Sequence, residues 1–168
     1  MKSETSKLHQ KESSADISCG IITLSDSRKS EKLDLSGKYM AEEIEARYTL
    51  KSKMLIPDEK DQLIESIETM VNEDIDVILT TGGTGLDERD ITVETVESLF
   101  DKKLDGFGEI FRFKSYEEIG ASALLSRATA GVYKKALIFS MPGSPNAVKT
   151  ALGIIIDELP HIVHHAKK

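Results

Sequence analysis

Cysteine, tryptophan and long apolar runs are scarce in this chain. Its 168 residues include one cysteine and no tryptophan. The single Cys19 excludes an internal disulfide and fits a reducing compartment. It lies in an expected strand with no neighbouring base, which predicts a buried hydrophobe rather than a nucleophile. No apolar run approaches the roughly 20 residues of a membrane span, and the N-terminus has no apolar signal-peptide core. We therefore expect a cytoplasmic protein with no membrane partner.

Positive charge is also in short supply. Lys and Arg total 22 against 29 Asp and Glu, which gives a formal net charge of −7. A sequence-independent nucleic-acid binder needs a basic face, so we expect no nucleic-acid partner. The deficit does not exclude small anionic ligands, because a local loop can bind phosphate inside an acidic protein.

The length and composition predict one folded domain, since about 100–200 residues is the usual domain size. Residues 1–15 are mainly Lys, Ser, Glu and Gln with a single Leu. Such a segment buries too little apolar surface to order itself, so we expect a disordered N-terminal arm. The domain is expected to span residues 16–168.

Short β-branched runs alternate with segments of helical periodicity along this domain. We expect strands at 17–24, 49–56, 74–80, 128–132 and 136–141. We expect helices at 36–48, 59–73, 92–100, 107–119 and 144–159. This alternation predicts an α/β fold, a single three-layer α/β/α domain with a mainly parallel sheet. The last helix is apolar around most of its circumference, so we expect a subunit neighbour to cover the side that faces away from the sheet.

Polar loops follow four of the expected strands. They comprise residues 25–28, 57–59, 80–90 and 142–146. In an open parallel sheet, ligands bind beyond the carboxyl ends of the strands, so all four loops are expected at one edge. Their small, hydroxyl and acidic side chains are of the types that bind phosphates and metal ions.

The third loop begins with the sequence Thr-Thr-Gly-Gly-Thr-Gly at residues 80–85. Glycines allow backbone N–H groups to approach an anion closely, and Thr hydroxyls add donors. The candidate anion-binding residues are Thr81, Gly82, Gly83, Thr84 and Gly85. Neither the Walker motif nor GxGxxG is present, so a plain strand-to-helix turn stays open as the alternative.

Two aspartates are the candidate catalytic and metal-binding residues. Asp58 follows the second expected strand, and Asp90 follows the glycine loop. Mg²⁺ binds through one or two carboxylates together with substrate phosphates, and a carboxylate can also accept a proton from an attacking group. The alternative for Asp58 is a cap of the helix at Glu59, and the alternative for Asp90 is a cap or dipole partner of the helix at Thr92.

The last loop carries Pro142, Gly143 and Ser144 immediately before a helix. Backbone and hydroxyl donors at a helix N-terminus suit an anion. A helix start with Ser144 at the N-cap and Pro145 at the first position explains the same residues. Ser126 and Arg127 could also reach a phosphate, and the alternative for Arg127 is a surface or interface residue.

Taken together and in this order, the motifs resemble the MogA/MoaB family of molybdenum cofactor biosynthesis proteins, specifically its MoaB branch. The matching segments are 22–28, 56–58, 79–85 with Arg89-Asp90, 106–109, 125–128 and 141–145. The resemblance runs from about Cys19 to His161. It implies the same three-layer α/β fold and assembly into a homotrimer or homohexamer.

The resemblance implies adenylylation of molybdopterin: its terminal phosphate attacks the α-phosphate of ATP, pyrophosphate leaves, and Mg²⁺ assists. Adenylyl-molybdopterin would then pass to a separate molybdenum-insertion protein. Carried over residue by residue, Asp58 and Asp90 belong to the Mg-ATP side of the site and the glycine loop cradles nucleotide phosphates. Ser25, Asp26 and Ser144 fall where pterin or phosphate contacts are expected.

One departure from the MogA-type pattern supports an alternative function. Residues 86–88 read Leu-Asp-Glu, which places two extra negative charges near the expected phosphates. The alternative is a non-catalytic molybdopterin-binding or carrier protein. The presence of both aspartates favours the enzyme, because a carrier has no need of them.

Overall fold

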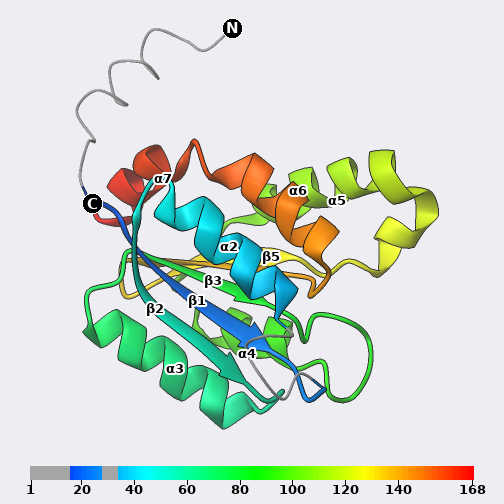
Figure 1. Cartoon of the computed structure of the whole chain (residues 1–168), viewed down its shortest axis with the longest axis horizontal. Coiled ribbons are helices and arrows are strands. Elements are labelled where there is room, and N and C mark those ends of the chain that lie inside the picture. Colours follow the sequence, from blue (N-terminus) through cyan, green and yellow to red (C-terminus); the bar gives the residue numbers. More distant parts are fainter. Residues whose placement is uncertain (1–15, 28–33) are drawn as a thin grey trace, which may run out of the picture.

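A six-stranded sheet forms the centre of the structure, a computed structural model that describes residues 16–27 and 34–168 (Figure 1). The strands are β1 (Ser18–Leu24), β2 (Thr49–Ile56), β3 (Val77–Thr81), β4 (Lys102–Lys103), β5 (Thr129–Tyr133) and β6 (Ala136–Met141). The helices are α2 (Leu35–Glu45), α3 (Lys60–Asn72), α4 (Thr92–Leu99), α5 (Asp105–Ile119), α6 (Pro145–Ile155) and α7 (Leu159–Ala166), with a 3₁₀ helix η2 (Gly120–Leu125). The expected arm at residues 1–15 lies outside the described residues.

The strand order is β2-β1-β3-β6-β5-β4, and the first four strands run parallel. β5 is antiparallel to both of its neighbours. The reason is the two-residue link Lys134-Lys135, whose φ angles of 47° and 69° form a tight hairpin turn. A parallel connection would need a crossover of a dozen or more residues. The expectation of a mainly parallel sheet is therefore confirmed.

Two apolar clusters, one on each face of the sheet, give the three layers. On one face α2, α5, α6 and α7 pack on alternate strand residues such as Ile21 and Leu79. On the other face α3 and α4 pack on the intervening residues, such as Ile22 and Ile78. Successive side chains of a strand point to opposite faces, and this alternation assigns each residue to its cluster. Figure 1 shows the two helical layers on opposite sides of the sheet.

Cys19 lies in the core of this sheet, fully buried. Burial, with a smaller contribution from the charge of Asp76, raises the pKa of its thiol to about 12. A thiol with such a pKa is not a nucleophile near neutral pH. The prediction of a buried hydrophobe is confirmed.

The expected helix at 144–159 is wrong in its extent, because α6 ends at Ile155 and a second helix begins at Leu159. Pro160 has no N–H to donate to the carbonyl of Ile156, and the Tyr48 hydroxyl donates to that carbonyl at 2.6 Å instead. α6 lies between α2 and α5 (Figure 1). Helices of the same chain therefore flank it on both sides, and the subunit neighbour expected on its outer side stays a prediction.

The third strand begins three residues later than expected. Asp74 has a positive φ of 53° and turns the chain, and Asp76 then accepts a hydrogen bond from the backbone N–H of Ser18 at 2.8 Å.

Within residues 16–27 and 34–168, no helix combines the length and the apolarity of a membrane span.

Candidate functional site

A cavity of about 550 Å³ opens at the carboxyl ends of β1, β2, β3 and β6. All four polar loops reach it, as the parallel-sheet rule predicts. From these loops the lining includes Ser25, Asp26, Asp58, Gly82, Gly83, Thr84, Gly85, Asp90, Pro142, Gly143 and Ser144. The structure thus brings together every candidate site residue except Thr81.

Thr81 lies behind the cavity wall. It is the last residue of β3, is fully buried, and donates its hydroxyl to the carbonyl of Pro142 at 3.0 Å. This bond ties the glycine loop to the loop after β6. Thr81 is placed to support the wall rather than to touch a ligand.

The glycine loop needs its first two glycines for backbone reasons. Gly82 and Gly83 have φ angles of +97° and +63°, which side-chain-bearing residues rarely adopt. A Cβ at Gly82 would lie 2.2 Å from the carbonyl oxygen of Leu24. Thr92 holds the loop from α4, because its hydroxyl donates to the Gly82 carbonyl at 2.8 Å and its N–H to the Gly83 carbonyl at 2.9 Å.

Asp58 is not a helix cap, so that alternative is wrong. The N-cap of α3 is Glu59, which makes no side-chain cap bond. Asp58 and Asp26 instead exchange two bonds: the Asp26 N–H donates to Asp58 Oδ2 at 3.0 Å, and the Asp58 N–H donates to Asp26 Oδ1 at 3.1 Å. The loops after β1 and β2 are thereby joined.

The second carboxylate oxygen of Asp58, Oδ1, is buried and has no hydrogen-bond partner among the described residues. Burial raises the pKa of this carboxyl, and the negative charges of Asp26 and Asp90 raise it further, against the lowering effect of the Asp26 N–H. A buried carboxylate oxygen without a partner is costly unless a ligand satisfies it. Asp58 therefore offers a fixed, unsatisfied oxygen at the cavity.

Asp90 does not cap α4 either, since the N-cap is Ile91 and it makes no side-chain bond. The Asp90 Oδ2 atom accepts from the N–H of Asp87 at 3.0 Å. The carboxylate packs on the glycine loop, because a Cβ at Gly85 would lie 2.4 Å from Asp90 Oδ2. The cap alternative is therefore wrong for both aspartates.

Asp26 lines the cavity, and Arg89 engages both of its carboxylate oxygens. The expected pterin or phosphate contact of Asp26 stays a prediction. Arg89 Nε donates to Oδ2 at 2.9 Å and Nη2 donates to Oδ1 at 3.0 Å, while Nη1 pairs with Glu59 at 2.9 Å. The hydrogen bonds from Arg89 and from the Asp58 N–H lower the pKa of Asp26. Arg89 is part of the Arg89-Asp90 motif, but nothing in the sequence indicated its pair with Asp26.

The loop after β6 serves two purposes. The Ser144 hydroxyl accepts from the Ala147 N–H at 3.2 Å, so the predicted N-cap with Pro145 at the first helical position is confirmed. The same Ser144 lines the cavity with Gly143. The carbonyl of Gly143 accepts a bond from Ser36 at 2.7 Å, which fixes the loop against α2.

Sequence reasoning missed most of the cavity wall that α5, η2 and the following Ser126 supply; of its residues only Ser126 was considered as a phosphate contact. This wall comprises Phe111, Ser115, Ile119, Ser122, Ala123, Leu125 and Ser126. It combines apolar and hydroxyl side chains, the mixture that suits a flat heterocycle with polar edges. The segment follows no strand, so the rule that pointed to the other loops gave no signal here.

A divalent cation at this site would have few protein ligands. In the described ranges no group of three or more His, Cys, Asp or Glu side chains is arranged to hold a metal ion. Among the described residues, only Asp58 and Asp90 line the cavity with carboxylates that no arginine engages. Two carboxylates completed by substrate phosphates and water are the donor set of Mg²⁺.

Comparison with known proteins gives concordant matches. The family model described as "Probable molybdopterin binding domain" matches residues 20–161. The chain is 43% identical over 165 residues to the molybdopterin adenylyltransferase of Pyrococcus furiosus, with 95% of this chain and 97% of the relative covered. It is 44% identical over 164 residues to molybdenum cofactor biosynthesis protein B of Bacillus subtilis, with 95% and 96% covered.

Among solved structures, the chain is similar to the tungsten cofactor synthesizing protein MoaB from Pyrococcus furiosus. The TM-score is 0.86 at 43% sequence identity, and the match covers 92% of this chain and 99% of the other. The expected fold and family resemblance are therefore confirmed.

Proposed function

The chain belongs to the family of probable molybdopterin binding domains, and from this premise we propose that it is a molybdopterin adenylyltransferase of molybdenum cofactor biosynthesis. Its substrates are ATP and molybdopterin. The observation that carries the proposal is one cavity lined by the glycine loop, by Asp58 and by Asp90. Relatives named for this activity share 43–44% identity with nearly the whole chain.

The reaction joins two phosphates. An oxygen of the terminal phosphate of molybdopterin forms a bond to the α-phosphorus of ATP, and the bond from that phosphorus to the bridging oxygen breaks. Pyrophosphate leaves with the electron pair. A phosphate monoester is largely dianionic at pH 7, so the attacking oxygen needs no strong base. The protein's task is to hold two anions in line and to offset their charge.

The loops around the cavity can perform this task. Backbone N–H groups of the glycine loop and of the α6 N-terminus at Ser144 are suited to phosphate oxygens. The mixed wall from α5 and η2 is suited to the pterin. Mg²⁺ would neutralise phosphate charge when bound, and Asp58 Oδ1 with Asp90 would hold it.

The acidic departure at residues 86–88 supports the carrier alternative less than the sequence suggested. Asp87 and Glu88 are exposed and line a separate hollow beside α4 rather than the cavity. Charges that face solvent act through a higher dielectric than charges that line the cavity, so we expect them to oppose nucleotide binding less than lining carboxylates would. A carrier would also have no use for the unsatisfied oxygen of Asp58.

A turnover assay tests the proposed function. Purified protein with molybdopterin, ATP and Mg²⁺ should yield adenylyl-molybdopterin, followed by chromatography, and pyrophosphate in equal amount. EDTA should stop the reaction, and renewed Mg²⁺ should restore it. Retained molybdopterin binding with no product would contradict the enzyme and favour the carrier. Product formation that EDTA leaves unchanged would contradict the metal assignment.

The assembly is part of the proposal. Six large apolar side chains on α5 and η2 are exposed: Ile110, Phe113, Tyr116, Ile119, Leu124 and Leu125. A monomer rarely leaves such a group uncovered, so we expect a homotrimer or homohexamer to bury it. Light scattering should give three or six times the chain mass, and Phe113→Glu should shift the protein toward a monomer. A monomeric wild type at micromolar concentration would contradict this assembly.

Two further statements complete the proposal. Adenylyl-molybdopterin needs an acceptor that replaces the adenylyl group with the metal, so a downstream molybdenum-insertion protein is the expected partner. The cytoplasm is the expected location, because ATP and reduced pterins are available there and the chain has a single cysteine.

A further inference from the structure

We propose that Arg127 is a positioning residue that clamps the loop between the glycine motif and Asp90. The proposal rests on the adenylyltransferase function, and it assigns to Arg127 a role other than phosphate binding. Arg127 follows η2 and stands next to Ser126 in the cavity wall. It lies 43 residues from Thr84 and 37 from Asp90 along the chain.

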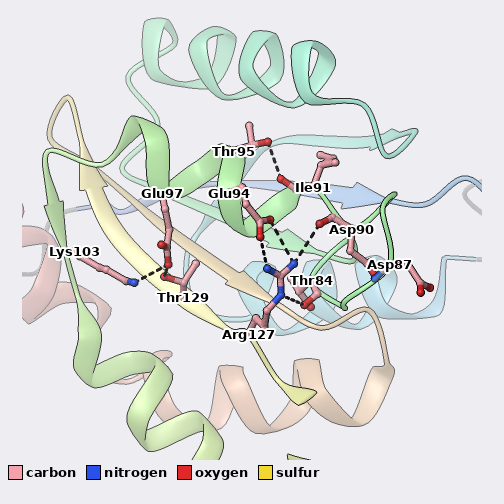
Figure 2. A network of polar contacts seen from close by, with 10 residues as sticks. All are labelled: Thr84, Asp87, Asp90, Ile91, Glu94, Thr95, Glu97, Lys103, Arg127 and Thr129. Carbon is pink, nitrogen blue, oxygen red and sulfur yellow. Dashed lines mark hydrogen bonds and ion pairs between the residues drawn. The ribbon is translucent and has the colours of Figure 1, made fainter. Parts of the chain in front are cut away.

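The guanidinium group joins the two ends of the loop. Arg127 Nε donates to the carbonyl of Thr84 at 3.1 Å, and Nη2 donates to the carbonyl of Asp90 at 3.2 Å. Figure 2 shows both bonds converging on the one guanidinium. Because the acceptors are backbone atoms, the clamp fixes the path of the chain at both positions.

A carboxylate on α4 completes the clamp. Glu94 accepts from Nη1 and, at 3.4 Å, from Nη2 of Arg127 (Figure 2). The bond to Arg127 is the main reason that the pKa of Glu94 is lowered. Glu94 lies in the first turn of α4, so the arginine is anchored to a helix on one side and holds a loop on the other.

The number of donors argues against a direct phosphate role. Arginine has five N–H groups in a fixed plane, and Arg127 uses four of them on Thr84, Asp90 and Glu94. The one remaining N–H cannot form the bidentate hydrogen bonds by which arginine binds a phosphate. Glu94 also offsets the positive charge that would attract the anion.

The clamped loop is exposed at residues 86–89, and its other bonds are local or reach exposed carboxylates. The Asp87 N–H donates to Asp90 Oδ2 and the Asp90 N–H to the Asp87 carbonyl, while Arg89 pairs with Asp26 and Glu59. Asp90 is the carboxylate that must face the bound phosphates. By fixing the carbonyls of Thr84 and Asp90, Arg127 sets the spacing between the glycine loop and that carboxylate.

The test compares three variants with one matched control. Arg127→Ala removes the clamp, Arg127→Lys keeps the charge but cannot bridge two carbonyls and a carboxylate, and Glu94→Gln weakens the anchor. The control is Arg112→Lys, since Arg112 also donates to a backbone carbonyl, that of Ala128 at 3.2 Å, but touches no residue of the loop. The readouts are kcat, KM for ATP, the Mg²⁺ concentration for half-maximal rate, and hydrogen exchange over residues 84–91.

Arg127→Ala should lower kcat by about 10- to 100-fold, because a displacement on the order of 1 Å at a reacting group has that effect. The KM for ATP should stay within about threefold, the Mg²⁺ requirement should rise, and exchange over residues 84–91 should speed up. Arg127→Lys should resemble Arg127→Ala, Glu94→Gln should be intermediate, and Arg112→Lys should match the wild type.

Each contrary result has a distinct meaning. A raised KM with an unchanged kcat, rescued by Arg127→Lys, would show that Arg127 binds phosphate directly and would overturn the clamp. Unchanged exchange over residues 84–91 in Arg127→Ala would overturn it as well. Exchange does not require turnover, so an inactive wild type would contradict the proposed function while the clamp is still tested.

Discussion

Asp58→Asn and Asp90→Asn should each abolish most adenylylation while the protein stays folded. Each change removes the negative charge that would hold Mg²⁺ against the phosphates and keeps the side chain's size. Loss of one such electrostatic contact lowers kcat by about 10²–10³-fold or more. The turnover assay with molybdopterin, ATP and Mg²⁺ measures this, with circular dichroism to verify folding.

The matched control is Asp87→Asn, which makes the same chemical change in the same loop but outside the cavity. It should turn over like the wild type. Wild-type rates in both Asp58→Asn and Asp90→Asn would contradict the assignment of the carboxylates. A loss in Asp87→Asn as large as in Asp90→Asn would show that loop charge, rather than the cavity, is responsible.

The pH dependence gives Asp58 a second signature. Burial and the charges of Asp26 and Asp90 raise its pKa above 3.8, so the ionised form is lost at a higher pH than for an ordinary aspartate. The wild-type rate should therefore fall as the pH drops through that raised pKa. In Asp90→Asn one repelling charge is gone, so the residual rate should fall at a lower pH.

The contribution of Asp58 to the stability of the folded protein changes with pH in the direction opposite to its contribution to the rate. A carboxyl whose pKa is higher in the folded than in the unfolded protein favours folding below the unfolded pKa, and this advantage is lost as the pH rises through the folded pKa. At neutral pH the charged Asp58 therefore opposes folding, and Asp58→Asn should be at least as stable as the wild type. Urea unfolding at several pH values measures the difference, and a clear loss of stability at pH 7 would contradict it.

The sequence predicted the edge of the sheet at which the site lies, because that inference needs only strand order along the chain. The bounds 49–56 and 136–141 match β2 and β6, where continuous apolar or β-branched runs are bounded by turn residues. The meeting of Asp58, the glycine loop and Ser144 follows from the rule for parallel strands. These inferences depend on local pattern.

What the sequence could not predict are contacts between distant segments. The bonds of Arg127 to Thr84 and of Arg89 to Asp26 join residues 43 and 63 positions apart, and no periodicity encodes them. The break after α6 has the same origin, because the Tyr48 hydroxyl donates a hydrogen bond to the carbonyl of Ile156, 108 residues away. Local pattern places the functional loops, whereas long-range hydrogen bonds decide which of their residues bind and which hold others in place.

Gly82→Ala and Gly153→Ala should change stability in opposite directions, although the chemical change is the same. Gly82 has a φ of +97°, and a Cβ there would lie 2.2 Å from the carbonyl oxygen of Leu24, a backbone atom that cannot rotate away. Backbone strain of this kind costs on the order of 1–3 kcal/mol, and the steric clash adds to it. The shift would separate the glycine loop from the end of β1, so turnover should be lost together with stability.

Gly153 is the control because it lies in α6, where a Cβ would meet nothing within 4 Å. Alanine there should stabilise the fold by about 0.5–1 kcal/mol, because it loses less backbone entropy than glycine in a helix, and turnover should be unchanged. Urea unfolding and the turnover assay measure both effects. A Gly82→Ala protein as stable and active as the wild type would show that the loop does not need a left-handed backbone at this position. That result would contradict the proposal that the glycine loop binds phosphates through this geometry.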